Sequence, residues 1–550
     1  MSLENEKNEL VPTEDTASET VETTVQNDDP FSALANPTVR ERKDVTLSHS
    51  AKKKILWCVL AGIAVIVCVV IALLIWVFPE KEDDTLPTED PAIVVLDKSK
   101  DSTLTIASAN LQLQDGTVLN FYNKDGALIL KQYEKFDMSV VNMDALIDVL
   151  STFTATTDLG EQENLSQYGF DKPTATGAVT YTDNTTYKFV LGAQTPDKKG
   201  QYFREDGKNH VYILSTDDTL FMTQLPLDYV STAVMSAPEL DKNVDTSAEI
   251  VMRNMTLSGS LRKNMPFTFR MVTSEDSDAY MYYNYIITSP YVKGVDSNVS
   301  SSVQSFTSLT AEAVVAVNPT AADLQEYGLD DPTTIAAFTL ACRTTEKAGT
   351  GDDEDTVTKY SNLQDHVIKL GKLAGAQYYV MIDDKPVVYL VAEKNLPFAT
   401  WEYDDLADTM LFLEDITNIT AFKVETPDKT TLFNLKHNPD DDNNETNLTV
   451  TAGDKTCDTM DFRHLMQVYM RISRYTSLKT DVAGKPLQMT MSVYLNGKST
   501  PSLTVKFYQM SSNLSAAILS NGEKYQVRTS EIDNVLKQTQ NLLDGKTVLY

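Results

Sequence analysis

Two runs of acidic side chains are the residues best suited to binding chemistry in this sequence, because clustered carboxylates are the ligands that calcium prefers. They are Asp352, Asp353, Glu354 and Asp355 in one run, and Asp440, Asp441 and Asp442 in the other. Neither run has the alternating ligand spacing or the glycine of an EF-hand loop. We therefore interpret both as solvated hairpin loops, with calcium binding as the open alternative, and we predict no metal site.

The residues that could carry out catalysis do not form a recognisable motif. The histidines are His49, His210, His366, His437 and His464. Their spacing gives no His-Glu-x-x-His zinc motif, and the sequence has neither a Gly-x-Ser-x-Gly turn nor a phosphate-binding glycine loop. We therefore predict that the protein is not an enzyme and that it has no catalytic residues and no cofactor. No small-molecule substrate is identified.

A cluster of tyrosines offers a second kind of binding chemistry. The cluster is Tyr280, Tyr282, Tyr283 and Tyr285. In a strand, alternate positions would put two rings on each face, where they could stack on a glycan or a peptide. An ordinary core or edge strand explains the same residues, and we favour that interpretation.

Charge and cysteine content narrow the class of partner. The 550 residues include 78 acidic and 47 basic side chains, which gives a net charge of −31. Nucleic acid is therefore not predicted as a partner, because phosphate binding needs basic surface. The four cysteines are too few for a disulfide-stapled domain. Whether Cys342 and Cys457 pair with each other is left open.

A repeated motif marks the elements that would position these residues. Residues 168–174 read YGFDKPT, and residues 327–333 read YGLDDPT. In each copy a helical turn is expected to end at the glycine, in the left-handed conformation, and the proline then directs the chain into a strand. We therefore predict a structural role for the motif residues, which are Tyr168, Gly169, Asp171, Pro173, Tyr327, Gly328, Asp330 and Pro332.

Similar elements surround both copies of the motif and predict repeated units. Alternating apolar runs predict strands, and apolar residues at helical spacing predict one longer helix per unit. These helices are expected around residues 143–150, behind a cap at Asn142, and around residues 303–309 and 460–469. A third, degenerate unit has Gly484-Lys485-Pro486 in place of the motif. The predicted units are 92–240, 246–402 and 410–550, each an antiparallel sheet with one longer helix.

An apolar run ahead of these units predicts a membrane anchor. Residues 55–78 contain no charge and no proline, and a helix of this length spans a bilayer. Basic residues before the run and acidic residues after it place the N-terminus in the cytoplasm. Residues 1–54 are predicted to be a disordered cytoplasmic tail, and residues 79–91 a stalk.

The predicted fold class is thus α+β, with a single transmembrane helix followed by an ectodomain of two or three repeated units. The predicted location is the cell membrane, crossed once, with the N-terminus cytoplasmic and the C-terminal ectodomain outside. The lipid bilayer is then one partner, through residues 55–78.

The two motif copies, together with the Leu-Gly that closes the next strand run and the tyrosine-rich strands after it, resemble the bacterial domain-of-unknown-function 4340 family over about residues 92–400. The resemblance implies a membrane-anchored protein of a Gram-positive bacterium. The family is associated with accessory proteins of ABC-type exporters, including gliding-motility auxiliary subunits, and it supplies no catalytic residues. The implied function is a non-catalytic accessory or assembly subunit, with an exporter permease or an envelope complex as partner. The alternative is a surface-binding module for cell-wall polymer, glycan or peptide.

Overall fold

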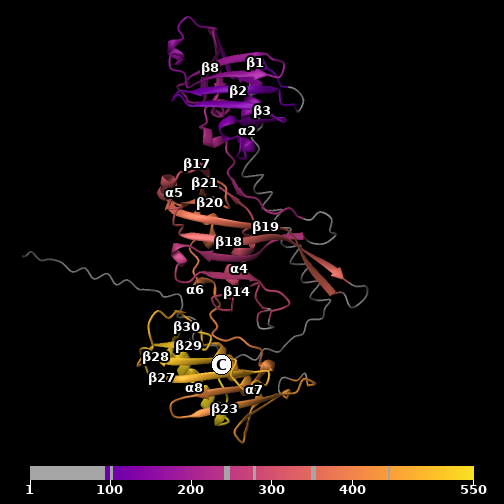
Figure 1. The fold of residues 1–550 in the computed structure, drawn as a ribbon, viewed down its shortest axis with the longest axis vertical. Helices are drawn as coiled ribbons and strands as arrows, with labels where there is room; N and C mark the ends of the chain where they lie inside the picture. The colour runs from indigo at the N-terminus through magenta and orange to yellow at the C-terminus, as the bar shows by residue number, and fades with distance from the viewer. Residues whose placement is uncertain are drawn as a thin grey trace, which may run out of the picture. The chain divides into compact units, whose positions relative to one another are not determined.

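The computed structural model describes residues 93–99, 103–240, 248–276, 280, 282–348, 355–441, 443 and 446–550 (Figure 1). All described residues belong to one compact unit, Asp90–Tyr550. The predicted tail (1–54), transmembrane helix (55–78) and stalk (79–91) lie outside the described residues. Among the helices that are described, none is long and apolar enough to cross a membrane.

Most strands of the described part of the chain form three antiparallel sheets of eight, nine and nine strands. In sheet order, the first sheet is β4 (Ala127–Leu130), β3 (Val118–Lys124), β2 (Ile106–Leu113), β7 (Ala175–Tyr181), β8 (Thr186–Gln194), β9 (Gly200–Glu205), β10 (His210–Ser215) and β6 (Thr157–Glu161). The second sheet is β15 (Lys293–Gly294), β14 (Tyr285–Ser289), β13 (Phe267–Met271), β12 (Ala248–Ser258), β18 (Thr334–Ala348), β19 (Asp355–Ala374), β20 (Gln377–Ile382), β21 (Val387–Ala392) and β17 (Ala313–Val317). The third sheet is β25 (Lys455–Cys457), β24 (Leu448–Ala452), β23 (Thr430–His437), β22 (Ile419–Glu425), β27 (Leu487–Leu495), β28 (Leu503–Gln509), β29 (Leu514–Leu519), β30 (Lys524–Arg528) and β26 (Thr476–Ser477). Two short ribbons pair β1 (Ile93–Asp97) with β5 (Thr152–Ala155), and β11 (Ala233–Met235) with β16 (Leu309–Thr310).

One strand order recurs in all three sheets. Each sheet begins with a meander from its centre to one edge, and the chain then passes through a helix to the opposite edge. A second meander then fills the sheet between its centre and the strand at that opposite edge. The connecting helices are α2 (Val140–Ser151), α4 (Ser297–Ser305) and α7 (Thr459–Met470). The third sheet therefore shares the topology of the first two, although its sequence lacks the Tyr-Gly motif.

Alternation of buried and exposed residues explains why these segments form strands. In β23, buried and exposed side chains alternate from Thr430 to Lys436, as expected for a strand with one face on the core. In α7, the buried side chains recur at helical spacing, and the Asp458 side chain accepts a hydrogen bond from the Asp461 N–H at the N-terminus. The remaining helices are α3 (Thr216–Leu220), α5 (Ala321–Tyr327), α6 (Tyr403–Leu406) and α8 (Thr529–Leu543).

The buried side chains form two large clusters rather than three. One cluster lies within the first sheet and includes Leu146 of α2 and Phe189 of β8. The other is continuous through the second and third sheets and includes Phe338, Tyr403 and Phe507. The second and third sheets therefore share one hydrophobic core.

The predicted fold class is wrong for the described residues. Antiparallel sheet dominates there, and most of the helices are short segments that connect strands. The helix expected around residues 303–309 shows why, because α4 ends at Ser305 and Leu309 already belongs to β16. Val303, Phe306 and Leu309 are all buried, so a spacing of three arose from a helix, a loop and a strand that face one core. The cap of α2 is Ser139 and not Asn142.

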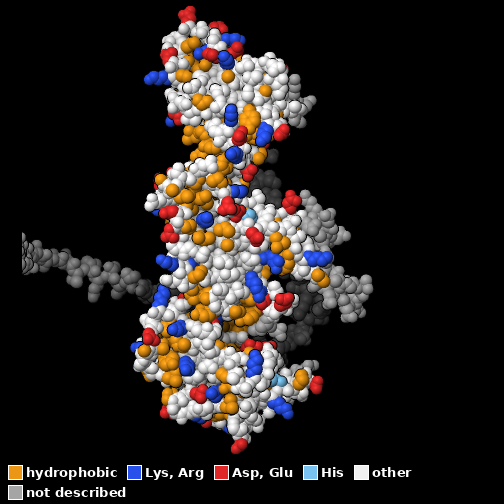
Figure 2. All heavy atoms as spheres, viewed as in Figure 1, with side chains coloured by type: hydrophobic (Ala, Val, Ile, Leu, Met, Phe, Trp, Pro, Cys, Tyr) orange, Lys and Arg blue, Asp and Glu red, His pale blue; other side chains and the backbone are white. Residues whose placement is uncertain are grey.

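Charged side chains of both signs are mixed on the face of the molecule that Figure 2 shows. On the face shown in Figure 2, acidic and basic side chains are interspersed over the described strands and loops. The excess of acidic residues thus produces no single acidic field on that face. Surface charge therefore does not mark a candidate site on that face, and the surface cavities and buried polar groups are the remaining candidates.

Candidate functional site at the junction of the second and third sheets

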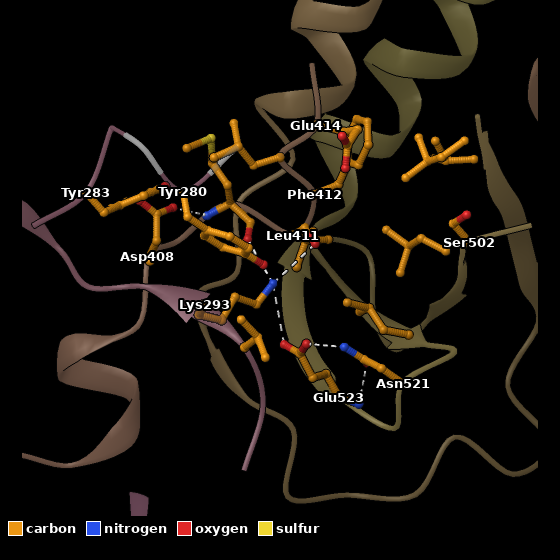
Figure 3. A pocket seen from close by; sticks show the side chains of 18 residues that line it. Tyr280, Tyr283, Lys293, Asp408, Leu411, Phe412, Glu414, Ser502, Asn521 and Glu523 are labelled. Atoms are coloured by element: carbon orange, nitrogen blue, oxygen red, sulfur yellow. Dashed lines mark hydrogen bonds and ion pairs between the residues drawn. The ribbon is translucent and has the colours of Figure 1, made fainter. Parts of the chain in front are cut away.

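A cavity of about 200 Å³ with a mixed polar and apolar lining lies where the second and third sheets meet (Figure 3). The second sheet contributes β15 and the loops on either side of β14, and the third contributes the ends of β27 and β28 and the turn between β29 and β30. The segment between the two sheets, residues 408–414, forms a further wall. The polar lining consists of Tyr280, Tyr283, Lys293, Asp408, Glu414, Ser502, Asn521 and Glu523.

A buried ion pair joins the two sheets at this cavity. The Lys293 Nζ lies 3.4 Å from a carboxylate oxygen of Glu523, and the two side chains are 10% and 1% exposed. The same ammonium donates to the carbonyls of Met410 and Leu411, both at 3.2 Å. Burial lowers the pKa of Lys293, and the adjacent Glu523 carboxylate partly opposes that change. Asn521 and the Tyr525 hydroxyl also donate hydrogen bonds to Glu523.

Arg474 forms a second buried joint next to the ion pair. Its side chain is 2% exposed, and it donates to the Asp404 carboxylate at 2.6 Å and to the Asp408 carbonyl at 2.8 Å. The guanidinium lies 5.5 Å from the centre of the Tyr525 ring and 5.8 Å from that of Tyr403. The hydroxyls of these two tyrosines are 3.2 Å apart. Polar and aromatic contacts thus continue without a break from Asp404 to Lys293.

Asp408 closes the network on the opposite side of the cavity. Its carboxylate accepts hydrogen bonds from the Tyr283 hydroxyl at 2.9 Å and from the Met410 N–H at 2.7 Å. Burial raises the pKa of Tyr283, and the negative charge of Asp408 raises it further. Each charged group of the network therefore has hydrogen-bond or ionic partners, as buried charges need to offset their loss of hydration.

Acidification is expected to weaken this network because it protonates the Asp404 carboxylate. Burial raises the pKa of that carboxyl, but hydrogen bonds from Ser477 and the charge of Arg474 outweigh burial and hold the pKa below its ordinary value of 3.8. A carboxyl with a lowered folded-state pKa stabilises the fold above its unfolded pKa, and that stability is lost as the pH falls through the folded pKa.

Unfolding experiments between about pH 6 and pH 3 should therefore show a smaller loss of stability on acidification in Asp404→Asn than in the wild type. The slope with pH is the readout, because the substitution also changes the stability at neutral pH. Equal slopes for the two proteins would contradict the assignment.

The structure places the motif residues away from this cavity, at two equivalent corners of the first and second sheets. Gly169 follows a short 3-10 helix, Ser166–Tyr168, and Gly328 follows α5, with φ of +80° and +70°. Asp171 and Asp330 are exposed, whereas the hydrophobic residue before each aspartate, Phe170 or Leu329, is buried. Pro173 and Pro332 are half-buried.

Each corner rests on a second glycine that the motif does not contain. A Cβ atom added to Gly192 would lie 2.2 Å from the Tyr168 carbonyl oxygen, and one added to Gly371 would lie 2.2 Å from that of Tyr327. The motif tyrosines also contact a tyrosine of the following hairpin, with ring centres 4.8 Å apart for Tyr168 and Tyr202. The corresponding distance for Tyr327 and Tyr379 is 4.5 Å. The Leu-Gly of the strand and the Tyr-Gly of the turn therefore form one packing unit.

The acidic runs and histidines do not converge on a site in the described part of the chain. Asp441 accepts hydrogen bonds from the Asn443 N–H and the Thr446 hydroxyl within its own loop, at 2.9 and 2.7 Å. Asp442 and residues 352–354 lie outside the described residues. No group of three potential metal ligands occurs among the described residues. His210 and His366 pair with Asp158 and Asp383, whereas His437 contacts a backbone carbonyl and His464 stacks on Tyr550. His49 is not among the described residues.

The tyrosine cluster does not form the predicted strand. Only Tyr285 lies in a strand, where it is fully buried, and Tyr282 is 87% exposed in the preceding loop. Tyr280 and Tyr283 line the cavity instead. Cys342 and Cys457 are both buried and unbonded to each other.

Sequence reasoning missed Lys293, Arg474 and Glu523, the charged residues at the centre of the junction. No local pattern marks them, since each is a charged residue in an otherwise ordinary strand or loop. A lysine within the apolar-flanked segment Tyr291–Val295 was the only available signal.

Three sheets of one strand order, two of which share a core and a buried ionic joint, define a protein built from repeated antiparallel units. The family described as Domain of unknown function (DUF4340) matches residues 133–245 and 287–485, which is more than half of the chain. The chain therefore belongs to that family, as the motifs predict. The match begins later than the predicted resemblance and continues through α7 into the third sheet. No curated protein and no solved structure matches the chain.

Proposed function

We propose that this chain is a non-catalytic accessory or assembly subunit of an ABC-type exporter or envelope complex. In this proposal, residues 55–78 attach it to the cell membrane of a Gram-positive bacterium, with the N-terminus in the cytoplasm and the three sheets outside. The exporter permease or another protein of the envelope complex is its partner.

The observation that carries the proposal is that the charged groups around the cavity already have hydrogen-bond or ionic partners within the chain. Lys293 is held by Glu523 and two carbonyls, and Asp408 by Tyr283 and a backbone N–H. An acid, base or nucleophile needs a free reactive atom within reach of a substrate. These groups instead fix one sheet against the next, which is the property that a rigid scaffold for assembly requires.

Cross-linking in intact cells tests this function. The full-length protein, carrying an affinity tag, is cross-linked at the cell surface, and the bound proteins are identified by mass spectrometry. An unrelated tagged protein with its own membrane anchor is the control. We expect a transporter permease or ATPase to be enriched over that control. Recovery of wall fragments alone would overturn the proposal.

A groove on the third sheet favours a second candidate function, the binding of a peptide at the cell surface. The groove follows α7, has a volume of about 480 Å³ and includes Met460, Met466 and Met470. The exposed side chain of Tyr282 also lines it. Methionine side chains adapt to varied apolar ligands, which suits a surface that accepts peptides of different sequence.

A further inference from the structure

The groove along α7 and the junction cavity share part of their lining. Leu413 and Glu414 line both of them, so the two hollows meet at one short segment of the chain. The groove measures about 480 Å³ and the cavity about 200 Å³. A ligand in the groove therefore contacts a segment that also belongs to the junction of the second and third sheets.

One face of α7 supplies much of the groove. Its lining residues recur there at the spacing of neighbours on a helix surface, and they are Met460, Arg463, His464, Met466, Gln467 and Met470. Residues 413–419 add Leu413, Ile416 and Ile419. Ile419 and Met466 are buried, whereas Met460 is 36% exposed. The groove thus offers apolar side chains both at depth and at the surface.

The groove also contains two acidic and two basic side chains, and three of these four are engaged within the chain. Arg463 donates to the Asn447 side chain at 2.7 Å. Hydrogen bonds from Thr417 lower the pKa of Asp415, and the positive charge of Arg463 lowers it further. The His464 ring stacks on that of Tyr550, with ring centres 4.1 Å apart.

Glu414 is the fourth of these side chains, and it has no counter-charge among the described residues. One carboxylate oxygen accepts a hydrogen bond from the Asn418 amide at 2.9 Å. No described residue donates to the other oxygen, and no described lysine or arginine forms an ion pair with it. Figure 3 shows Glu414 on the opposite side of the cavity from Glu523 and Lys293. A half-buried carboxylate of this kind binds a cation through a charge-assisted hydrogen bond.

The charges around Glu414 favour a basic ligand over an acidic one. In the two hollows taken together, carboxylates outnumber lysine and arginine: Asp408, Glu414, Asp415 and Glu523 stand against Lys293 and Arg463. All of these side chains belong to the described part of the chain. Since Glu414 presents one oxygen rather than two, it suits the point charge of an ammonium better than the planar fork of a guanidinium.

We propose that the α7 groove binds an apolar segment of a partner protein that carries one lysine. The apolar side chains of that segment pack on Met460, Met466 and Met470, and the lysine ammonium donates to the second oxygen of Glu414. The inference rests on the second candidate function, peptide binding at the cell surface, and it names the chemistry of the peptide.

Three fluorescent peptides of equal length test this preference on the purified full-length protein. Each has leucines at the same positions, separated by serines, and one central residue that is lysine, norleucine or glutamate. Norleucine has the stem of lysine without the ammonium. Fluorescence anisotropy gives each Kd. We expect the lysine peptide to bind roughly tenfold more tightly than the norleucine peptide, and the glutamate peptide to bind most weakly.

A matched pair of substitutions assigns the preference to one carboxylate. Glu414→Gln keeps the shape of the side chain and removes its charge, so it should bind the lysine and norleucine peptides equally. Its affinity for the norleucine peptide should match that of the wild type. Glu425→Gln is the control, because Glu425 lies on β22 of the same sheet, outside the groove, and 2.9 Å from the Lys423 Nζ. The preference for lysine should persist in this variant.

A second pair of substitutions places the peptide in the groove. Met460→Ala should weaken the binding of all three peptides, because each loses apolar contact with the same side chain. Leu432 on β23 is 41% exposed and does not line the groove. Leu432→Ala should therefore leave all three affinities unchanged.

Several outcomes would overturn the inference. Equal binding of the lysine and norleucine peptides to the wild type, or an undiminished preference in Glu414→Gln, would remove Glu414 as the cation site while peptide binding stands. Tightest binding of the glutamate peptide would assign the choice of ligand to Arg463 instead. A dimer in sedimentation that the lysine peptide dissociates would assign the groove to a second copy of the chain. Failure of all three peptides to bind would overturn the second candidate function as well, and the cross-linking result is independent of each outcome.

Discussion

Gly371→Ala is expected to lower the free energy of unfolding by about 3 kcal/mol, because the new methyl group overlaps a backbone atom that cannot move independently. The added Cβ would lie 2.2 Å from the Tyr327 carbonyl oxygen. Its other neighbours are Leu329 and Gly328 of the same turn. To relieve the overlap, the whole helix-to-strand corner must shift away from β19. Denaturant unfolding of the full-length protein, followed by circular dichroism, measures the effect.

Gly375→Ala is the matched control, four residues further along the chain. Gly375 has a φ of +67° but open space around its Cβ position, so alanine there meets backbone strain without overlap. We expect a loss of about 1 kcal/mol for this substitution. Gly192→Ala, at the equivalent corner of the first sheet, should resemble Gly371→Ala. If Gly371→Ala costs no more than Gly375→Ala, then the close packing of the corner does not limit stability.

Glu523→Gln is expected to lower the free energy of unfolding by about 3 kcal/mol, because it leaves the Lys293 ammonium buried without its counter-charge. Glutamine has nearly the size of glutamate, but Asn521 and the Tyr525 hydroxyl donate to different oxygens of Glu523, and the oxygen that becomes an amide nitrogen can no longer accept, so one of these hydrogen bonds is lost together with the charge. Removing one partner of a buried ion pair is far more costly than replacing both partners. The double variant Lys293→Met, Glu523→Gln should therefore recover part of the lost stability.

A surface ion pair supplies the control for this substitution. The Lys98 Nζ lies 2.8 Å from a carboxylate oxygen of Asp183, which is well within salt-bridge distance. The two side chains are, however, 28% and 43% exposed. Water screens such a pair, and Asp183→Asn should change stability little. Equal losses for Glu523→Gln and Asp183→Asn, or no recovery in the double variant, would show that the buried pair does not hold the junction together.

The sequence was most informative where local chemistry repeats. The two Tyr-Gly-x-Asp-x-Pro-Thr segments and the strand runs around them are local patterns, and the family match includes both of them. Helical spacing was less reliable, because Phe306 and Leu309 face the core from a loop and a strand at intervals that imitate a helix. A short window of sequence does not distinguish a continuous helix from a helix that is followed by a loop and a strand.

The candidate site could not be predicted in the same way. Lys293 and Glu523 belong to different sheets, and nothing in the residues around either one indicates a partner more than two hundred positions away. Their pairing is a result of how two sheets pack, and such packing leaves no periodic trace in a single sequence. Gly192 and Gly371 lay within recognised strand runs, but their role is visible only once the carbonyl that rests on each is known.

The division of the buried side chains into two clusters means that the number of repeats is not the number of cooperative units. The second and third sheets share a core, whereas the first sheet has its own. Disorder that begins in one of the paired sheets exposes the apolar surface of the other, so these two sheets gain and lose their structure together. The first sheet is energetically more independent. The described part of the chain thus repeats one topology three times but gathers most of its buried side chains into two large clusters.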